Sequence, residues 1–280
     1  MHLPTNVALP LEYFLAFLLI VVSPLVSYFY ERPFLRSISS SAQKVGFYRY
    51  ILIVQWPIAA AALWISGPGN LFFPPASPGH GLPSYASILF AILLGAFFIL
   101  GLMPLVQSLR GERLRAVYAA AYRRSLCDVS KLLPDTREER RWFAAVCVTA
   151  GVCEEILARG FTFRYLDGIA MHLSLAVILL LASAIFGINH IYQGKLGMLK
   201  TGIAGLAFGG LFLLSGNLLL PILLHIAIDL QTVFVLRPAR ADAEMPIPGR
   251  SESEQHLDPP LLTRTGEKQK ASELSPRDLL

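Results

Sequence analysis

The feature that most constrains this chain is a series of apolar runs whose lengths match the thickness of a lipid bilayer. A transmembrane helix needs roughly 20 consecutive apolar residues, and seven runs approach or reach that length. Only 15% of the 280 residues are charged, whereas an ordinary soluble domain carries about 25%. The sequence therefore predicts an all-α fold, a polytopic membrane helix bundle. The expected spans are Leu11–Tyr30, Phe47–Ser66, Ser84–Leu109, Trp142–Phe163, about Ala170–Asn189, about Leu196–Leu214 and Leu218–Leu236.

The basic residues lie mainly in alternate connections between these runs, after the first, third, fifth and seventh. Cytoplasmic loops of membrane proteins are enriched in Lys and Arg, so this pattern predicts an integral, multi-pass protein with its N-terminus outside and its C-terminus in the cytoplasm. The most basic connection, Arg110–Arg141, contains RLRAVYAAAYRRSL, whose spacing predicts an amphipathic helix on the membrane surface. The net charge of +5 is thereby explained without a nucleic-acid partner.

Four segments are expected along the chain. Residues 1–110 hold the first three spans, and residues 111–141 hold the basic cytoplasmic loop with its amphipathic helix. Residues 142–236 form the core of spans four to seven. Residues 237–280 are polar and rich in proline, a composition that predicts a disordered cytoplasmic tail.

Three charges interrupt the fourth apolar run, in the stretch GVCEEILARG at 151–160. Each charge near the centre of a bilayer costs roughly 3 kcal/mol on insertion scales, so these groups need partners or a chemical role. Glu155 and Arg159 are four residues apart on one helix face, with the acid N-terminal, which favours an ion pair. Glu154 lies about 100° around the helix from Glu155 and has no local cation. It therefore needs a partner from another helix, or a proton.

Two other stretches supply candidate partners. FGINH ends the fifth run and places Phe186 and His190 four residues apart, on one helix face. HIAID in the seventh run does the same with His225 and Asp229. An inward pair of histidine and carboxylate at this spacing suits the binding of a water or a metal, or the orientation of another ligand.

The three stretches EEILAR, FGINH and HIAID resemble, in that order, the E-E-x-x-x-R, F-x-x-x-H and H-x-x-x-N/D motifs of the CPBP family. This family contains type II CAAX prenyl endopeptidases and bacteriocin-processing proteins. The resemblance covers about Trp142–Leu236 and implies that the core cleaves peptide bonds within the membrane. It also implies that Glu154 acts as general base together with His190.

The resemblance assigns the remaining motif residues to support of the reaction. Glu155 and Arg159 are implied to brace the helix, with Phe186 as a further structural residue. His225 and Asp229 are implied to stabilise the oxyanion or to hold the reacting water. Asp229 stands where well-known CAAX proteases carry asparagine; it is expected to be protonated or to orient His225 through its ring N–H.

Two mechanisms fit these residues. Glu154, His190, His225 and Asp229 would suit a Zn²⁺ site with an open position for water. The same side chains would also position a water without a metal, with Glu154 removing its proton. The metal-free mechanism is the favoured expectation, so no cofactor is predicted and zinc is the alternative.

The spacing of the motifs adds a geometric expectation. With a tight turn at 164–168, Glu154 and His190 would differ in depth by roughly 18 Å at 1.5 Å per residue. We therefore expect the fourth helix to begin in the cytoplasm. We also expect GFTFRYLDGIAMH, residues 160–172, to form a longer excursion that is neither a two-residue turn nor a straight continuation of the helix. A cavity opening toward the cytoplasmic half follows from this arrangement.

The predicted function is hydrolysis of a peptide bond in a membrane-associated substrate, such as a prenylated C-terminal peptide, a sorting-signal tail or a bacteriocin leader. The lipid bilayer is the other expected partner, and no oligomeric state is predicted. An ion-coupled transporter is an alternative, because intramembrane carboxylates and histidines also mark proton relays. A non-catalytic immunity or scaffold protein on the same fold is another, although intact Glu154, His190 and His225 weigh against it.

Overall fold

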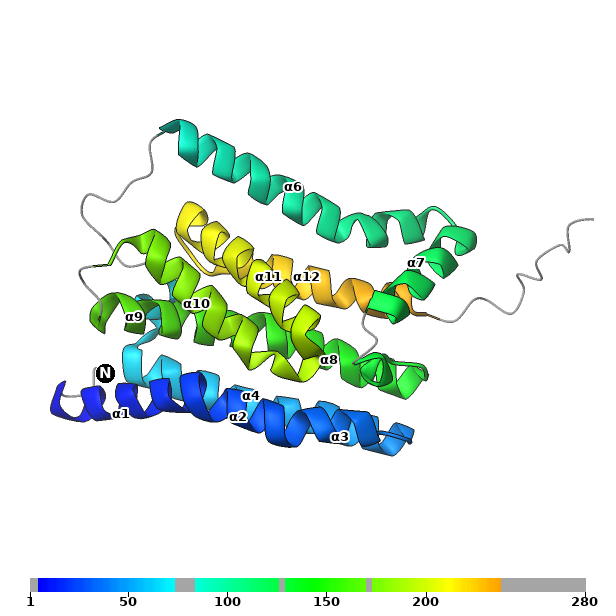
Figure 1. The fold of residues 1–280 in the computed structure, drawn as a ribbon, viewed down its shortest axis with the longest axis horizontal. Helices are drawn as coiled ribbons and strands as arrows, with labels where there is room; N and C mark the ends of the chain where they lie inside the picture. The colour runs from blue at the N-terminus through cyan, green and yellow to red at the C-terminus, as the bar shows by residue number, and fades with distance from the viewer. Residues whose placement is uncertain (1–4, 74–83, 126–128, 170–172, 238–280) are drawn as a thin grey trace, which may run out of the picture. The chain divides into compact units, whose positions relative to one another are not determined.

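The computed structural model describes residues 5–73, 84–125, 129–169 and 173–237, and within these ranges every regular element is a helix (Figure 1). The predicted all-α membrane bundle is therefore confirmed. Of the predicted cytoplasmic tail, only Arg237 lies among the described residues.

The N-terminal half begins with one long helical run that contains two π-helical stretches. It is followed by a second long helix that starts at Ser41, after the N-cap residue Ser40. The side chain of Ser40 accepts from the Gln43 backbone N–H, and the side chain of Gln43 accepts from the Ser40 backbone N–H. This capping box places the helix start six residues before the predicted apolar run. The elements are α1 (Thr5–Phe17), η1 (Leu18–Val22), α2 (Ser23–Val26), η2 (Ser27–Glu31), α3 (Arg32–Ser37), α4 (Ser41–Ser66), α5 (Pro68–Phe72), α6 (Ser84–Leu109) and α7 (Glu112–Ser125).

The C-terminal half contains the three motifs. Its elements are η3 (Ser130–Leu132), α8 (Arg137–Glu155), η4 (Ile156–Thr162), α9 (Phe163–Ile169), α10 (Leu175–Asn189), η5 (Ile191–Gln193), α11 (Gly194–Ser215) and α12 (Leu219–Val235). α7 agrees with the amphipathic helix expected in the basic connection.

The surfaces of these helices are those of a membrane protein. Four helical segments are long and apolar enough to cross a bilayer: Ala8–Ser37, Ser41–Ser66, Ile88–Leu109 and Ile191–Ser215. Two shorter apolar helices, Leu175–Asn189 and Leu219–Val235, accompany them. Large apolar side chains such as Phe29 and Ile53 are each 71% exposed, and an apolar surface of this kind is normal where the solvent is lipid.

The segment after the first motif differs from expectation. The helical run that starts at Arg137 continues through the π-helical η4 and through α9 to Ile169. The predicted excursion is therefore wrong for residues 160–169, and its last part, residues 170–172, lies outside the described residues. Glu154 and His190 nevertheless lie at a similar depth in the bundle, for another reason. Glu154 lies 15 residues before Ile169, and His190 lies 15 residues after Leu175. The two arms, each about 22 Å long at 1.5 Å per residue, bring both residues to the same level.

α8 packs between α4 and α12 (Figure 1). A glycine permits the close approach of α12, because a Cβ atom at Gly151 would lie 2.4 Å from Cγ1 of Ile226 and 2.9 Å from its backbone nitrogen. Since Ile226 follows His225 directly in α12, this contact sets how close the third motif comes to the first. Cys153 is fully buried in the core next to the first motif.

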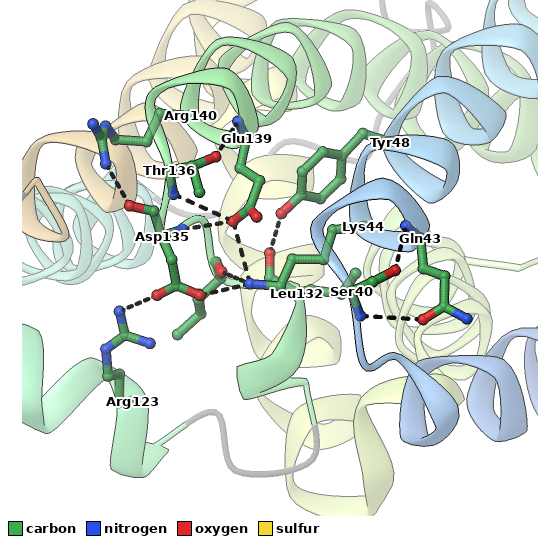
Figure 2. Close-up of polar contacts among 11 residues, drawn as sticks. Ser40, Gln43, Lys44, Tyr48, Arg123, Leu132, Asp135, Thr136, Glu139 and Arg140 are labelled. Carbon is green, nitrogen blue, oxygen red and sulfur yellow. Dashed lines mark hydrogen bonds and ion pairs between the residues drawn. The ribbon is translucent and has the colours of Figure 1, made fainter. Parts of the chain in front are cut away.

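A polar cluster ties the start of α8 to α4 (Figure 2). Nζ of Lys44 lies 2.6 Å from Oδ2 of Asp135 and 3.2 Å from Oε2 of Glu139. The hydroxyl of Tyr48 donates to the carbonyl of Leu132, and Arg123 reaches Asp135 from α7 at 2.8 Å. Thr136 and Glu139 form the capping box of α8.

The two acids of this cluster are held in their charged form. Burial raises the pKa of Asp135, but hydrogen bonds and charges from Lys44 and Arg123 outweigh it, so the pKa is below its ordinary value. Burial likewise raises the pKa of Glu139, and the Asp135 backbone N–H, Ser41 and Lys44 more than offset it. The cluster therefore fixes the position at which α8 begins.

Candidate functional site

Glu154 lies in the last turn of α8, directly before the π-helical η4. Its Oε2 atom is 3.6 Å from Nε2 of His190, at the end of α10. Its Oε1 atom accepts a hydrogen bond of 3.1 Å from Nε2 of Gln55, on α4. The side chains of Glu154 and His190 are 18% and 12% exposed, so both are largely buried but still accessible from outside the protein.

His190 is oriented by the end of its own helix. It forms the C-cap of α10, and its Nδ1 atom lies 2.8 Å from the carbonyl oxygen of Phe186. Because a carbonyl only accepts, Nδ1 carries the proton in this contact. The other ring nitrogen, Nε2, is thereby turned toward Glu154. The rings of Phe186 and His190 lie 4.7 Å apart, as expected for residues one turn apart.

Glu155 connects the first motif to the third. It is fully buried, and its Oε1 atom lies 2.8 Å from NH1 of Arg159 and 2.7 Å from Nδ1 of His225. The ion pair predicted between Glu155 and Arg159 is therefore present, with a further partner that sequence spacing did not identify. NH2 of Arg159 donates to the carbonyl of Gly205 on α11 at 3.2 Å.

The guanidinium of Arg159 lies between the rings that contact the two histidines. It is 4.3 Å from the ring centroid of Phe186 and 5.5 Å from that of Phe208. Phe208 in turn stacks on His225 at 4.8 Å. Cation–π contacts of this kind are strengthened by exclusion of water, and Arg159 is 3% exposed. The buried guanidinium of Arg159 thus contacts both of the phenyl rings that pack against His190 and His225.

Asp229 lies at the edge of the site. Its Oδ2 atom is 3.5 Å from Nε2 of His225, and its side chain is 36% exposed. Nδ1 of His225 lies against Glu155, and Nε2 is the ring nitrogen that lies nearer Asp229. Asp229 therefore faces the nitrogen of His225 that remains on the open side.

The side chains do not form a zinc site as they stand. Within the described ranges, no group of three or more His, Cys, Asp or Glu side chains is arranged to hold a metal ion. Nδ1 of His190 and Nδ1 of His225 lie against protein oxygens, so Nε2 is the nitrogen of each ring that a metal would use. The donor set predicted for Zn²⁺, Glu154, His190, His225 and Asp229, thus lacks the required grouping here.

Gln55 is a site residue that the sequence patterns did not indicate. The only signal for it was an amide side chain in an otherwise apolar stretch, ILIVQWPIAA at 51–60, and nothing in that stretch indicates which helix it faces. The structure also shows an apolar hollow of about 430 Å³ between α6, α11 and α12. None of the predicted site residues lines it, so it is separate from the site.

The fold and site define a polytopic membrane protein whose carboxylates and imidazoles meet inside the helix bundle. Residues 137–231 match the sequence model of a family described as type II CAAX prenyl endopeptidase Rce1-like. This segment therefore belongs to that protease family, which confirms the family predicted from the three motifs and identifies the core as that of a CAAX-type intramembrane protease. No curated protein and no solved structure matches the chain significantly.

Proposed function

We propose that this protein hydrolyses a peptide bond of a membrane-associated substrate with a water activated by Glu154 and His190. The observation that carries the proposal is the 3.6 Å separation of Glu154 Oε2 and His190 Nε2. The hydrogen bond of His190 Nδ1 to Phe186 leaves Nε2 free to accept. In the neutral form of His190, Nε2 and the Glu154 carboxylate are both acceptors, and a water beside both would donate one hydrogen to each.

The proposed reaction moves one proton in a cycle. Glu154 removes a proton from the water as its oxygen bonds to the peptide carbonyl carbon, and the carbonyl becomes an oxyanion. When the C–N bond breaks, Glu154 returns that proton to the leaving amine. The products are a carboxylic acid and an amine, and Glu154 ends as it began.

His225 is proposed to stabilise the oxyanion. With Nδ1 donating to Glu155 at 2.7 Å, Nε2 is the nitrogen that faces the open side, and in the imidazolium form it donates to the developing negative charge. Asp229, 3.5 Å from the same nitrogen, is placed to hold that form of the ring. An ionised aspartate cannot itself donate to the oxyanion.

The location of the site supports a membrane-associated substrate. Glu154 and His190 are inside a bundle with lipid-type surfaces, so the scissile bond has to be presented at the membrane. A prenylated C-terminal peptide, a sorting-signal tail and a bacteriocin leader each satisfy this condition.

We further propose that the N-terminus lies outside and the C-terminus in the cytoplasm. Fusion of a compartment-sensitive reporter to each end tests this orientation, and a C-terminal reporter that is active only outside would contradict it.

The proposed reaction proceeds without a metal cofactor. Activity is expected to survive treatment with a chelator followed by dialysis, and loss of activity that Zn²⁺ restores would contradict this.

Mutation of the proposed base and its partner tests the function. Purified wild-type protein, Glu154→Gln and His190→Ala are reconstituted in liposomes with membrane-anchored peptides of the three classes. We expect cleavage by the wild type and at least a 100-fold loss in each variant, with thermal unfolding in detergent little changed. Cleavage by a folded Glu154→Gln variant would refute the mechanism. Transport of an ion or solute without any cleavage would favour the transporter instead.

A further inference from the structure

A residue outside the matched segment contacts the proposed base. Gln55 lies on α4, and its Nε2 donates to Oε1 of Glu154 at 3.1 Å. The family match begins at residue 137, so this contact is not part of the three motifs.

The chemistry of the two side chains fixes the direction of this hydrogen bond. An ionised carboxylate only accepts, so the amide NH₂ of Gln55 has to face Glu154. The amide oxygen then points away, and it is buried without a protein hydrogen-bond partner among the residues that the structure describes. Because Oε1 of Glu154 is engaged by Gln55, Oε2 is the oxygen that faces His190.

Such a contact matters because the terminal torsion of a glutamate is loosely defined. Rotation about this sp³–sp² bond has a broad energy profile, so the plane of the carboxylate is set by its partners. A misplacement of about 1 Å at a reacting group can cost roughly 100-fold in rate.

We propose that Gln55 is a positioning residue that holds Glu154 with Oε2 toward His190 and the reacting water. This inference rests on the proposed function, because it assigns Gln55 a role in the same reaction. It also implies that the motif segment needs α4 to be fully active.

The test compares substitutions that differ in whether they keep a donor. Gln55→Met keeps the length and apolar stem of the side chain but removes the N–H. Gln55→His keeps an N–H at similar reach from the backbone. Trp56→Phe is the matched control, because the one side-chain N–H of Trp56, at Nε1, donates to Thr149 at 3.0 Å across the same pair of helices and not to Glu154. The enzyme is the full-length chain in liposomes, with a peptide that the wild type cleaves.

We expect Gln55→Met to lower kcat roughly 10- to 100-fold with KM changed less than about threefold, as for loss of a hydrogen bond to a charged group. Gln55→His should recover at least about fivefold of that loss, and Trp56→Phe should stay within about twofold of the wild type. Wild-type kcat in Gln55→Met would overturn the inference. So would equal losses in Gln55→Met and Trp56→Phe, or no recovery in a Gln55→His variant whose unfolding temperature matches that of Gln55→Met.

The inference and the proposed function fail in different ways. If the wild type and Glu154→Gln cleave equally, the proposed function is wrong. If Glu154→Gln is inactive while Gln55→Met is fully active, only the role of Gln55 is wrong.

Discussion

At the scale of single residues, two adjacent glutamates of α8 have different surroundings. Glu155 is fully buried and shared between Arg159 and His225. Glu154 is partly exposed, and among the residues that the structure describes its carboxylate oxygens contact Gln55 and His190. A rotation of about 100° per residue separates them, which turns one side chain into the packed interior and the other toward the open side. Their substitution by glutamine should therefore have different effects on the stability of the fold.

Glu155→Gln should destabilise the fold, while Glu154→Gln should not. Removing one partner of a buried ion pair leaves the other charge without compensation, at a cost of roughly 3–5 kcal/mol, and Arg159 and His225 both lose theirs. Thermal unfolding in detergent measures this, with Glu154→Gln as the matched control on the neighbouring residue. Equal unfolding temperatures for the two variants would contradict the structural role of Glu155.

The residue-scale contacts were only partly predictable from sequence. Spacing of four residues on a helix predicted the Glu155–Arg159 pair and the contact of Phe186 with His190. The contacts of Arg159 with Gly205 and Phe208, and of Gln55 with Glu154, join residues 46 or more positions apart. Periodicity within one helix contains no information about such partners, because they depend on how helices pack.

At the scale of elements, the site depends on how closely α12 approaches α8. Gly151 is in contact with Ile226, next to His225, and a Cβ atom there would meet the α12 backbone. Extra atoms at a packed position typically cost about 1–3 kcal/mol. Here the added cost includes displacement of His225 from Glu155.

Gly151→Ala should lower both the unfolding temperature and the cleavage rate. Gly168→Ala is the matched control, since a Cβ atom at Gly168 meets nothing within 4 Å and alanine favours a helix over glycine by up to about 1 kcal/mol. Unfolding temperature and initial rate are measured for both variants. A Gly151→Ala protein as active and as stable as Gly168→Ala would show that the close approach is unimportant.

Helix existence was predictable at this scale, but helix length was not. The apolar run ends at about Phe163, because Arg164 and Asp167 are polar, and yet the helix continues to Ile169. Phe163 and Leu166 are buried against α10, so tertiary packing keeps the helix intact past the end of its apolar pattern.

At the scale of the whole molecule, the first helices and the matched segment are joined by the polar cluster of Lys44, Asp135 and Glu139 (Figure 2). Glu139 is ionised in the folded protein with its pKa below the ordinary value of 4.5. Its contribution to stability is therefore present above about pH 4.5, and it is lost as the pH falls through the lowered pKa of the folded state.

Glu139→Gln should accordingly lower the unfolding temperature most near pH 7, and the difference from the wild type should shrink as the pH falls from about 5 toward 3. The control is Glu138→Gln, an exposed acid in the same helical turn, which should follow the wild type at every pH. A deficit in Glu139→Gln that does not change with pH would mean that the charge of Glu139 is not the stabilising feature.

The central claim is that Glu154 activates the water that cleaves a membrane-associated peptide. The most direct measurement is mass spectrometry of membrane-associated peptides and proteins from cells that express either the wild-type protein or Glu154→Gln at equal level. The account predicts at least one precursor that is shortened in wild-type cells and accumulates uncleaved in the variant. Identical precursor and product sets in the two cell lines, with both proteins folded in the membrane, would contradict it.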